Sequence, residues 1–84
     1  MRLDKFLKVS RVIKRRPVAN EACDSGRVSI NGKIAKASTD VKVGDIIEIK
    51  FGERFIKFEV MELNEVATKA GAEGMIKPLW ELLY

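Results

Sequence analysis

Residues 26–34 read Gly-Arg-Val-Ser-Ile-Asn-Gly-Lys-Ile, and this stretch decides the fold because two different periodicities meet in it. Gly26 is the residue type that ends a helix in the left-handed conformation. Arg27 to Ile30 then alternates polar and apolar side chains, as a half-buried strand does. Asn31-Gly32 is the strongest short hairpin signal, because both residues accept a positive φ, and Lys33 to Ala35 forms the return strand. The pattern predicts helices before Gly26 and strands after it.

A short helix is predicted over residues 2–9. Its apolar side chains follow the i, i+3, i+4 spacing of one helical face and are Leu3, Phe6 and Leu7. A basic turn is expected from Ser10 to Arg16, with Val12 and Ile13 as its inward-facing anchors. Because an isolated helix of this length is marginal in water, it must be held by packing on later parts of the chain.

A second helix is predicted to start near Pro17 and to close at Gly26. Proline suits the first helical position because its missing N–H needs no partner there. The residues that keep helical spacing are Val18, Ala19, Ala22 and Cys23. Cys23 lies on the apolar side of this helix, where we expect a buried, unreactive thiol.

Two longer strands are predicted after the turn Val43-Gly44-Asp45. Residues 47–51 alternate as a half-buried strand, and Gly52-Glu53 forms the tight turn that follows. Residues 55–60 place Ile56, Phe58 and Val60 on one face and Lys57 and Glu59 on the other. Two short N-terminal helices packed on a small antiparallel sheet with hairpins make an α+β fold.

The C-terminal segment has more than one interpretation. Pro78 is compatible with the start of a short C-terminal helix, along which Ile76, Leu79 or Trp80, and Leu83 would share one side. The segment then either covers an exposed face or edge of the sheet, or docks on a protein partner, since Trp and Tyr are enriched in binding hot spots. We expect residues 1–64 to form the main domain and residues 65–84 a partly helical C-terminal segment.

A chain of 84 residues with 46% hydrophobic and 33% charged residues predicts one small globular domain. The sequence has no His, which is the commonest general base and metal ligand. Its single Cys excludes an internal disulfide and a Cys-rich zinc site. No membrane span and no signal peptide are recognisable. We therefore expect a cytoplasmic protein that is not an enzyme and that carries no catalytic residue, metal or cofactor.

The positive charge is concentrated in the first half of the chain. Residues 1–44 hold eleven Lys and Arg against four Asp and Glu, a net charge of +7, whereas residues 45–84 carry a net charge of −3. Seven of the eleven basic residues fall within positions 2–16. Such a cluster attracts phosphate and favours nucleic acid as the partner, the alternative being a solvated helix face.

Residues 1–45 resemble a known RNA-binding family. The matching pieces, in chain order, are Arg2-Leu3-Asp4-Lys5-Phe6-Leu7, Arg11 with Lys14-Arg15-Arg16, Ala19, Gly26-Arg27-Val28, Asn31-Gly32 and Asp40-Val41-Lys42-Val43-Gly44-Asp45. They resemble the RNA-binding domain named after small-subunit ribosomal protein S-four, also called the αL motif. As a standalone domain the chain is similar to the RqcP (YabO) family. It is more distantly similar to the fifteen-kilodalton ribosome-associated heat-shock proteins, whose long basic C-terminal extension has no counterpart here. Pro17 departs from the pattern, in which Thr or Ser often caps the helix, and the lost cap is worth about 1 kcal/mol.

The resemblance implies a function on the ribosome. The RqcP family acts in bacterial ribosome-associated quality control, on large ribosomal subunits that are blocked by a peptidyl-tRNA. Resemblance to it implies contact with large-subunit ribosomal RNA and tRNA together, in support of C-terminal alanine tailing of the nascent chain. The tailing is coupled to a larger partner, RqcH. We expect the free protein to be a monomer and to have no membrane association.

Seven basic residues are candidates for RNA binding: Arg2, Lys5, Arg11, Lys14, Arg15, Arg16 and Lys33. Arg2 and Arg16 are the first choices, because the planar guanidinium group grips phosphate bidentately and stacks on bases. Four residues are assigned structural support: Asp4, Gly26, Asn31 and Gly32. Asp4 is expected to accept hydrogen bonds from Arg11 or nearby backbone and so to orient the cations. The hypothesis fails if Arg2 and Arg16 point to opposite sides or turn inward towards acidic neighbours.

Two rival functions stay open at this point. One is a detached RNA-binding domain that acts in trans with an RNA-modifying enzyme. The other is a protein-interaction adaptor whose hydrophobic C-terminal segment carries the activity. An electrostatic RNA contact with about four phosphates would give a slope of roughly −3 to −4 for log affinity against log salt.

Overall fold

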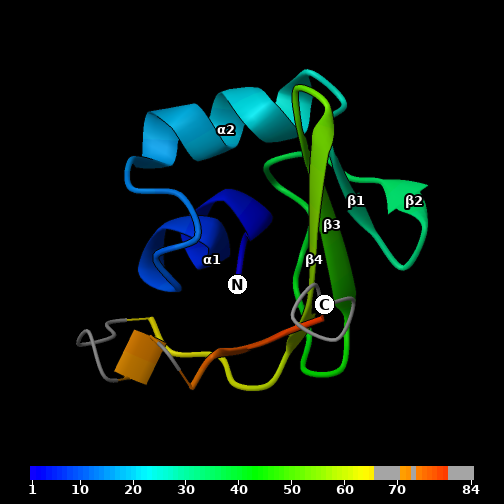
Figure 1. Ribbon diagram of the computed structural model, residues 1–84. Helices are drawn as coiled ribbons and strands as arrows, with labels where there is room; N and C mark the ends of the chain where they lie inside the picture. Colours follow the sequence, from blue (N-terminus) through cyan, green and yellow to red (C-terminus); the bar gives the residue numbers. More distant parts are fainter. Residues whose placement is uncertain (66–70, 73, 80–84) are drawn as a thin grey trace.

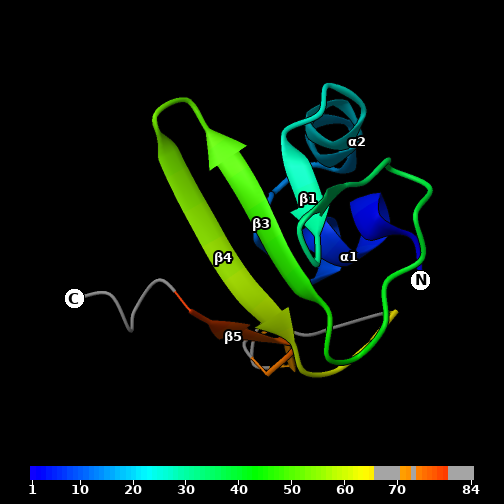
Figure 2. The same ribbon diagram turned by 90° about the vertical axis from the view of Figure 1, so that its right-hand side faces the viewer.

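The protein is described by a computed structural model that covers residues 1–65, 71–72 and 74–79. Two helices and five strands follow one another as α1 (Leu3–Val9), α2 (Arg16–Asp24), β1 (Val28–Ile30), β2 (Lys33–Ile34), β3 (Ile46–Phe51), β4 (Arg54–Val60) and β5 (Ile76–Pro78). Both helices lie on one face of the sheet (Figure 1), and the side view shows the strands in front of them (Figure 2). The predicted α+β fold is confirmed.

The strands form one antiparallel sheet in the order β2-β1-β3-β4-β5. The β1–β2 hairpin turns at Asn31 and Gly32, whose φ angles of 52° and 86° are the positive values predicted from the sequence. The β3–β4 pairing places Ile47 opposite Phe58 and Glu48 opposite Lys57. Successive residues of a strand point to opposite faces, so these two pairs separate a buried face from an open one.

The core lies between the helices and the inner face of the sheet. Its fully buried members are Leu3, Phe6 and Leu7 of α1, Ala19 and Cys23 of α2, Val28, Ile47, Ile49, Phe58 and Val60 of the strands, and Met75 just before β5. Burial of a Leu, Ile or Phe side chain is worth about 1.5–3 kcal/mol. This packing, rather than intrinsic helix propensity, stabilises two helices as short as α1 and α2.

The connection between the helices is the predicted basic turn. Ile13 is buried and Val12 is partly buried against the core, so both predicted anchors are confirmed. Arg11 has a φ of 63°, and its backbone N–H donates to the Lys8 carbonyl at 3.0 Å. A non-glycine residue in this left-handed conformation is strained by roughly 1–2 kcal/mol, and here it ends α1.

The second helix starts and ends close to the predicted positions. It begins at Arg16, one residue before Pro17, and its N-cap residue Arg15 makes no side-chain cap hydrogen bond. The chain leaves the helix through Gly26 with a φ of 82°. Cys23 is fully buried, and this burial, together with the charges of Asp4 and Asp24, raises the pKa of its thiol to about 11. The expected burial of Cys23 is confirmed.

The strand β5 was not predicted. Pro78 lies opposite Phe58 and ends this edge strand, so it does not start a helix. Proline is tolerated there because an edge strand can lack one N–H donor. The interpretation in which the C-terminal segment covers a sheet edge is confirmed for Ile76–Pro78. Trp80 and Leu83 lie outside the described residues, and the division into residues 1–64 and 65–84 stays a prediction.

No helix in the described ranges is long and apolar enough to cross a membrane. Over the same residues, no three His, Cys, Asp or Glu side chains are grouped so that they could hold a metal ion.

Candidate RNA-binding surface

The backbone of Arg2 is fixed by a segment far along the chain. Arg2 is the extended N-cap residue of α1 and forms an isolated antiparallel bridge with Asp40. On either side of this bridge, the Leu3 N–H donates to the Thr39 carbonyl at 2.8 Å and the Val41 N–H donates to the Met1 carbonyl at 2.8 Å. These contacts set the direction in which the Arg2 side chain leaves the fold.

Asp4 is the centre of the site. Its side chain is 3% exposed, and its Oδ1 accepts a hydrogen bond from the Lys5 backbone N–H at 2.8 Å. Arg2 Nε donates to the same oxygen at 3.2 Å. The other oxygen, Oδ2, accepts from Arg16 Nε at 3.4 Å and from Asn20 Nδ2 at 3.3 Å. One buried carboxylate thus joins the N-cap of α1 to the first turn of α2.

The charge on Asp4 is maintained by these donors. Burial by itself would raise the pKa of Asp4, but the hydrogen bonds from Asn20, Arg16, Arg2 and the Lys5 backbone outweigh it and hold the pKa below its usual range. Asp4 is therefore ionised at neutral pH and attracts both guanidinium groups.

Arg2 and Arg16 meet on one surface. Both turn towards an acidic neighbour, yet their side chains remain 51% and 46% exposed. Arg16 bonds Asp4 through its Nε alone, whereas Arg2 donates from Nε and also from Nη2, which lies 3.5 Å from Asp4 Oδ2. The remaining N–H groups of both guanidinium groups are not used by Asp4. The first condition under which the hypothesis would fail is not met, because the two side chains do not point to opposite sides. The second is met in part, because both guanidinium groups bond the buried carboxylate of Asp4 while half of each side chain stays exposed. Their contact with Asp4 orients them without burying them.

A hollow lies beside this cluster. It has a volume of about 380 Å³ and is lined by Asp4, Arg16, Pro17 and Asn20. Arg16 therefore borders an open space that a phosphate or sugar group can enter. The N-terminal end of α2 lies at the same place, where its backbone N–H groups and helix dipole favour an anion.

The side chains of the other five predicted basic residues, all of them in the described part of the chain, make no ion pair with Asp4 and lie in three different places. Lys5 Nζ lies 3.5 Å from Glu65 Oε1, a surface ion pair worth under about 1 kcal/mol. Arg11, Lys14 and Arg15 are exposed on the turn between the helices. Lys33 lies on β2, at the edge of the sheet away from α1 and α2 (Figure 1), and is not brought to the Asp4 cluster.

The predicted supporting residues have clear roles. Asp4 does accept a backbone hydrogen bond as expected, but its side-chain partners are Arg2, Arg16 and Asn20 rather than Arg11. Asn20 was not predicted, although it lies four residues after Arg16 and therefore on the same helical face. Asn31 adds a second role to its turn, because its side chain bonds Asp45 Oδ1 at 3.1 Å and the Ile46 N–H at 2.9 Å.

Comparison with known proteins identifies the family of this chain. The sequence profile of the S4 domain matches residues 1–47. The chain is 53% identical over 81 residues to the Bacillus subtilis protein named "RQC P-site tRNA stabilizing factor", covering 96% of this chain and 94% of that protein. The protein of the same name from Streptococcus pneumoniae is 51% identical over 81 residues, covering 96% of this chain and 92% of that one.

Solved structures show the same fold. Heat Shock Protein 15 of Vibrio cholerae superposes with a TM-score of 0.87 at 25% identity, over 99% of this chain and 85% of that one. The solution structure of a protein described as hypothetical protein HP1423 gives a TM-score of 0.79 at 32% identity, over 93% of this chain and 95% of that one. The chain belongs to the S4 domain family and, within it, to the family of the RQC P-site tRNA stabilizing factors.

Proposed function

We propose that this protein is a non-enzymatic RNA-binding factor of bacterial ribosome-associated quality control. In this proposal it binds the RNA of the large ribosomal subunit and a peptidyl-tRNA on blocked subunits. It thereby supports C-terminal alanine tailing of the nascent chain together with RqcH, and it works as a monomer in the cytoplasm. The relatives that carry the name "RQC P-site tRNA stabilizing factor", at about half identical residues, support the choice of process.

One observation carries the RNA-binding part of the proposal: a single buried carboxylate holds Arg2 and Arg16 on one surface, with half of each side chain in solvent. Binding normally costs roughly 0.5–1.5 kcal/mol for each long side chain that must be ordered. Asp4 orders both side chains before any ligand arrives. The N–H groups that Asp4 does not engage are then ready for contact with phosphate.

The proposed mechanism is positional and involves no bond making. Cationic contacts from α1, α2 and the turn between them grip ribonucleotide backbones, and they lower the free energy of one placement of the tRNA on the subunit. Lys5, Arg11, Lys14 and Arg15 add positive charge around Arg2 and Arg16. We place Lys33 outside this surface, as a separate contact at the edge of the sheet.

Co-sedimentation with large ribosomal subunits, with and without a bound peptidyl-tRNA, tests the proposal. Arg2→Ala and Arg16→Ala should each weaken association about tenfold and should each reduce the salt slope by about 1, as expected for a lost phosphate contact. Arg54→Ala is the matched control, because Arg54 is an exposed arginine on β4 that does not touch Asp4. Both site variants should melt within a few degrees of the parent protein, since the two side chains are half exposed.

Three results would overturn the proposal. The first is equal loss of association in Arg54→Ala, which would show that only overall charge matters. The second is an affinity that does not change with salt. The third is recovery of an RNA-modifying enzyme, in place of ribosomal subunits, when the protein is pulled from a lysate.

A further inference from the structure

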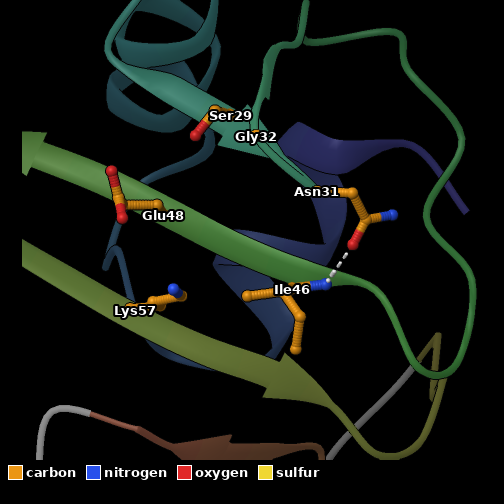
Figure 3. A pocket seen from close by; sticks show the side chains of 6 residues that line it. All are labelled: Ser29, Asn31, Gly32, Ile46, Glu48 and Lys57. Atoms are coloured by element: carbon orange, nitrogen blue, oxygen red, sulfur yellow. Dashed lines mark hydrogen bonds between the residues drawn. The ribbon is translucent and has the colours of Figure 1, made fainter.

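The face of the sheet that α1 and α2 do not cover carries an ordered row of side chains. Ser29 of β1 lies opposite Glu48 of β3, and Glu48 lies opposite Lys57 of β4. These residues alternate with the buried Val28, Ile47 and Phe58, so their side chains point away from the helices. Figure 3 shows them in front of the strands, with the helices behind.

A polar hollow of about 310 Å³ lies on this row. It is lined by Ser29, Asn31, Gly32, Ile46, Glu48 and Lys57. The carboxylate of Glu48 and the ammonium of Lys57 are direct cross-strand neighbours, yet they are not among the ion pairs of the described residues. The Asn31 amide is already engaged, since its oxygen accepts from the Ile46 N–H at 2.9 Å (dashed line in Figure 3). Glu48 and Lys57 are therefore the groups that remain available to a ligand.

A second hollow of about 210 Å³ adjoins the first and shares Ser29 and Glu48 with it. Its apolar borders are Ile34 and Phe55, which are 65% and 58% exposed. Its cationic borders are Arg27 and Lys50, and the Lys50 ammonium lies 5.9 Å from the centre of the Phe55 ring. An exposed aromatic ring with cations beside it is the usual platform for an unpaired base and its phosphate.

We propose that this open face binds unpaired nucleotides of RNA, with a guanine base in the first hollow and the neighbouring base stacked on Phe55 in the second. Guanine presents the donors N2–H and N1–H next to the acceptor O6 along one edge. A carboxylate beside an ammonium offers the complementary groups, so Glu48 accepts from both donors while Lys57 donates to O6. Recognition of splayed-out bases on their Watson–Crick edges is the general mode for single-stranded RNA.

The charge of the surface selects RNA over a protein partner. Three cations, Arg27, Lys50 and Lys57, border the two hollows against one carboxylate, so a phosphate backbone is attracted to this face. The single acid lies on the floor between the hollows, where it meets base donors rather than phosphate. This inference goes beyond the proposed function, because the face lies on the other side of the sheet from α1 and α2 (Figure 2). Both surfaces can therefore be occupied at once.

Fluorescence anisotropy with the full chain tests the proposal. The probes are short single-stranded uridine oligonucleotides that carry one central guanosine or one central adenosine. We expect the protein to bind the guanosine probe more tightly than the adenosine probe. Glu48→Gln should reduce the ratio of the two affinities about tenfold. Phe55→Ala should weaken binding of both probes about tenfold, because one stacking contact is lost.

Matched controls come from the same hairpin. Glu53→Gln changes an acid in the β3–β4 turn, and Phe51→Ala removes an aromatic ring that is 41% exposed. Neither residue lines either of the two hollows described above. Both controls should bind like the parent protein. Because all four side chains are at least partly exposed, thermal melting should confirm that every variant is folded.

The proposal is overturned if neither probe binds, or if Glu48→Gln and Phe55→Ala bind both probes as tightly as the controls do. It is also overturned if Arg16→Ala abolishes oligonucleotide binding while Phe55→Ala retains it. The oligonucleotide would then bind the surface that carries Arg2 and Arg16, and not the open face of the sheet. Loss of a protein partner in Phe55→Ala, with oligonucleotide binding unchanged, would assign the face to a protein instead. Loss of subunit association in Arg16→Ala with intact oligonucleotide binding supports the proposal and separates it from the ribosomal one.

Discussion

The helical side and the open sheet side of this protein arrange their charged side chains in opposite ways. On the helical side, Asp4 is buried and bonded to Arg2 and Arg16, so each of these two cations has a fixed orientation. On the open side, Glu48 and Lys57 face each other across two strands without forming an ion pair. The first arrangement suits a ligand of uniform charge. The second leaves a donor and an acceptor free, which suits a ligand that presents both.

The largest expected effect on the free energy of unfolding comes from comparing one residue on each face of β4. Phe58 of β4 is fully buried, whereas Phe55 of the same strand is 58% exposed. Phe58→Ala should lower the free energy of unfolding by about 3–5 kcal/mol, because it removes a large core side chain and leaves a cavity. Phe55→Ala should change it by about 0.5 kcal/mol or less. Urea denaturation of both variants measures the difference, and equal losses would contradict the assignment of the two faces.

Asp4→Asn should have the next largest effect. It should lower the free energy of unfolding at neutral pH by about 1–2 kcal/mol, a value reduced by solvent screening because both arginine partners are half exposed. The pKa of Asp4 is lower in the folded than in the unfolded chain, so its contribution is present above about pH 4. It is lost as the pH falls through the folded-state pKa. The gap between parent and variant should therefore close under acid conditions in urea titrations.

Glu48→Gln is the control for Asp4→Asn, because it also neutralises one acid on the folded chain. Glu48 makes no ion pair among the described residues, so this change should leave the free energy of unfolding within about 0.5 kcal/mol at any of these pH values. A pH-dependent loss in Glu48→Gln as large as that in Asp4→Asn would remove the distinction between the two surfaces.

A smaller effect than that of Asp4→Asn is expected at Arg11, whose φ of 63° lies in the left-handed region. Arg11→Gly should raise the free energy of unfolding by up to about 1 kcal/mol, because glycine adopts this conformation without strain. Arg11→Ala keeps the strain and should show no such gain. Both variants lack the guanidinium group, so they should lose the same RNA affinity in co-sedimentation. A stability gain in Arg11→Ala would contradict the strain argument.

The elements that the sequence predicts are those with local signals. The two helices follow from the spacing of their apolar residues, and the first hairpin follows from Asn31-Gly32, whose positive φ angles the structure confirms. The strand β5 has no such signal. It is three residues long, contains a proline, and exists only because its partner β4 offers an edge far away in sequence.

The residues of the candidate site were predicted from the sequence, but most of the hydrogen bonds between them were not. Arg2, Asp4 and Arg16 were all identified from their types and order in the chain. The sequence does not show that Asp4 joins Arg2 to Arg16, since this depends on how α1 and α2 cross on the sheet. Of the two donors expected for Asp4, a nearby backbone N–H is found, from Lys5, whereas its side-chain donors are Arg2, Arg16 and Asn20 in place of Arg11.

The hydrogen bonds of the Asn31 side chain also affect how fast this asparagine can deamidate. An asparagine followed by glycine is the pair most open to spontaneous deamidation, in which the next backbone nitrogen attacks the side-chain carbonyl and ammonia is lost. Here both ends of the amide are bonded, to Asp45 and to the Ile46 N–H, and this restrains the attack. If the reaction did occur, water would open the resulting cyclic imide, and the new carboxylate would face the carboxylate of Asp45. Slow chemical damage would then loosen the β1–β2 turn first, at the border of the polar hollow on the open face of the sheet.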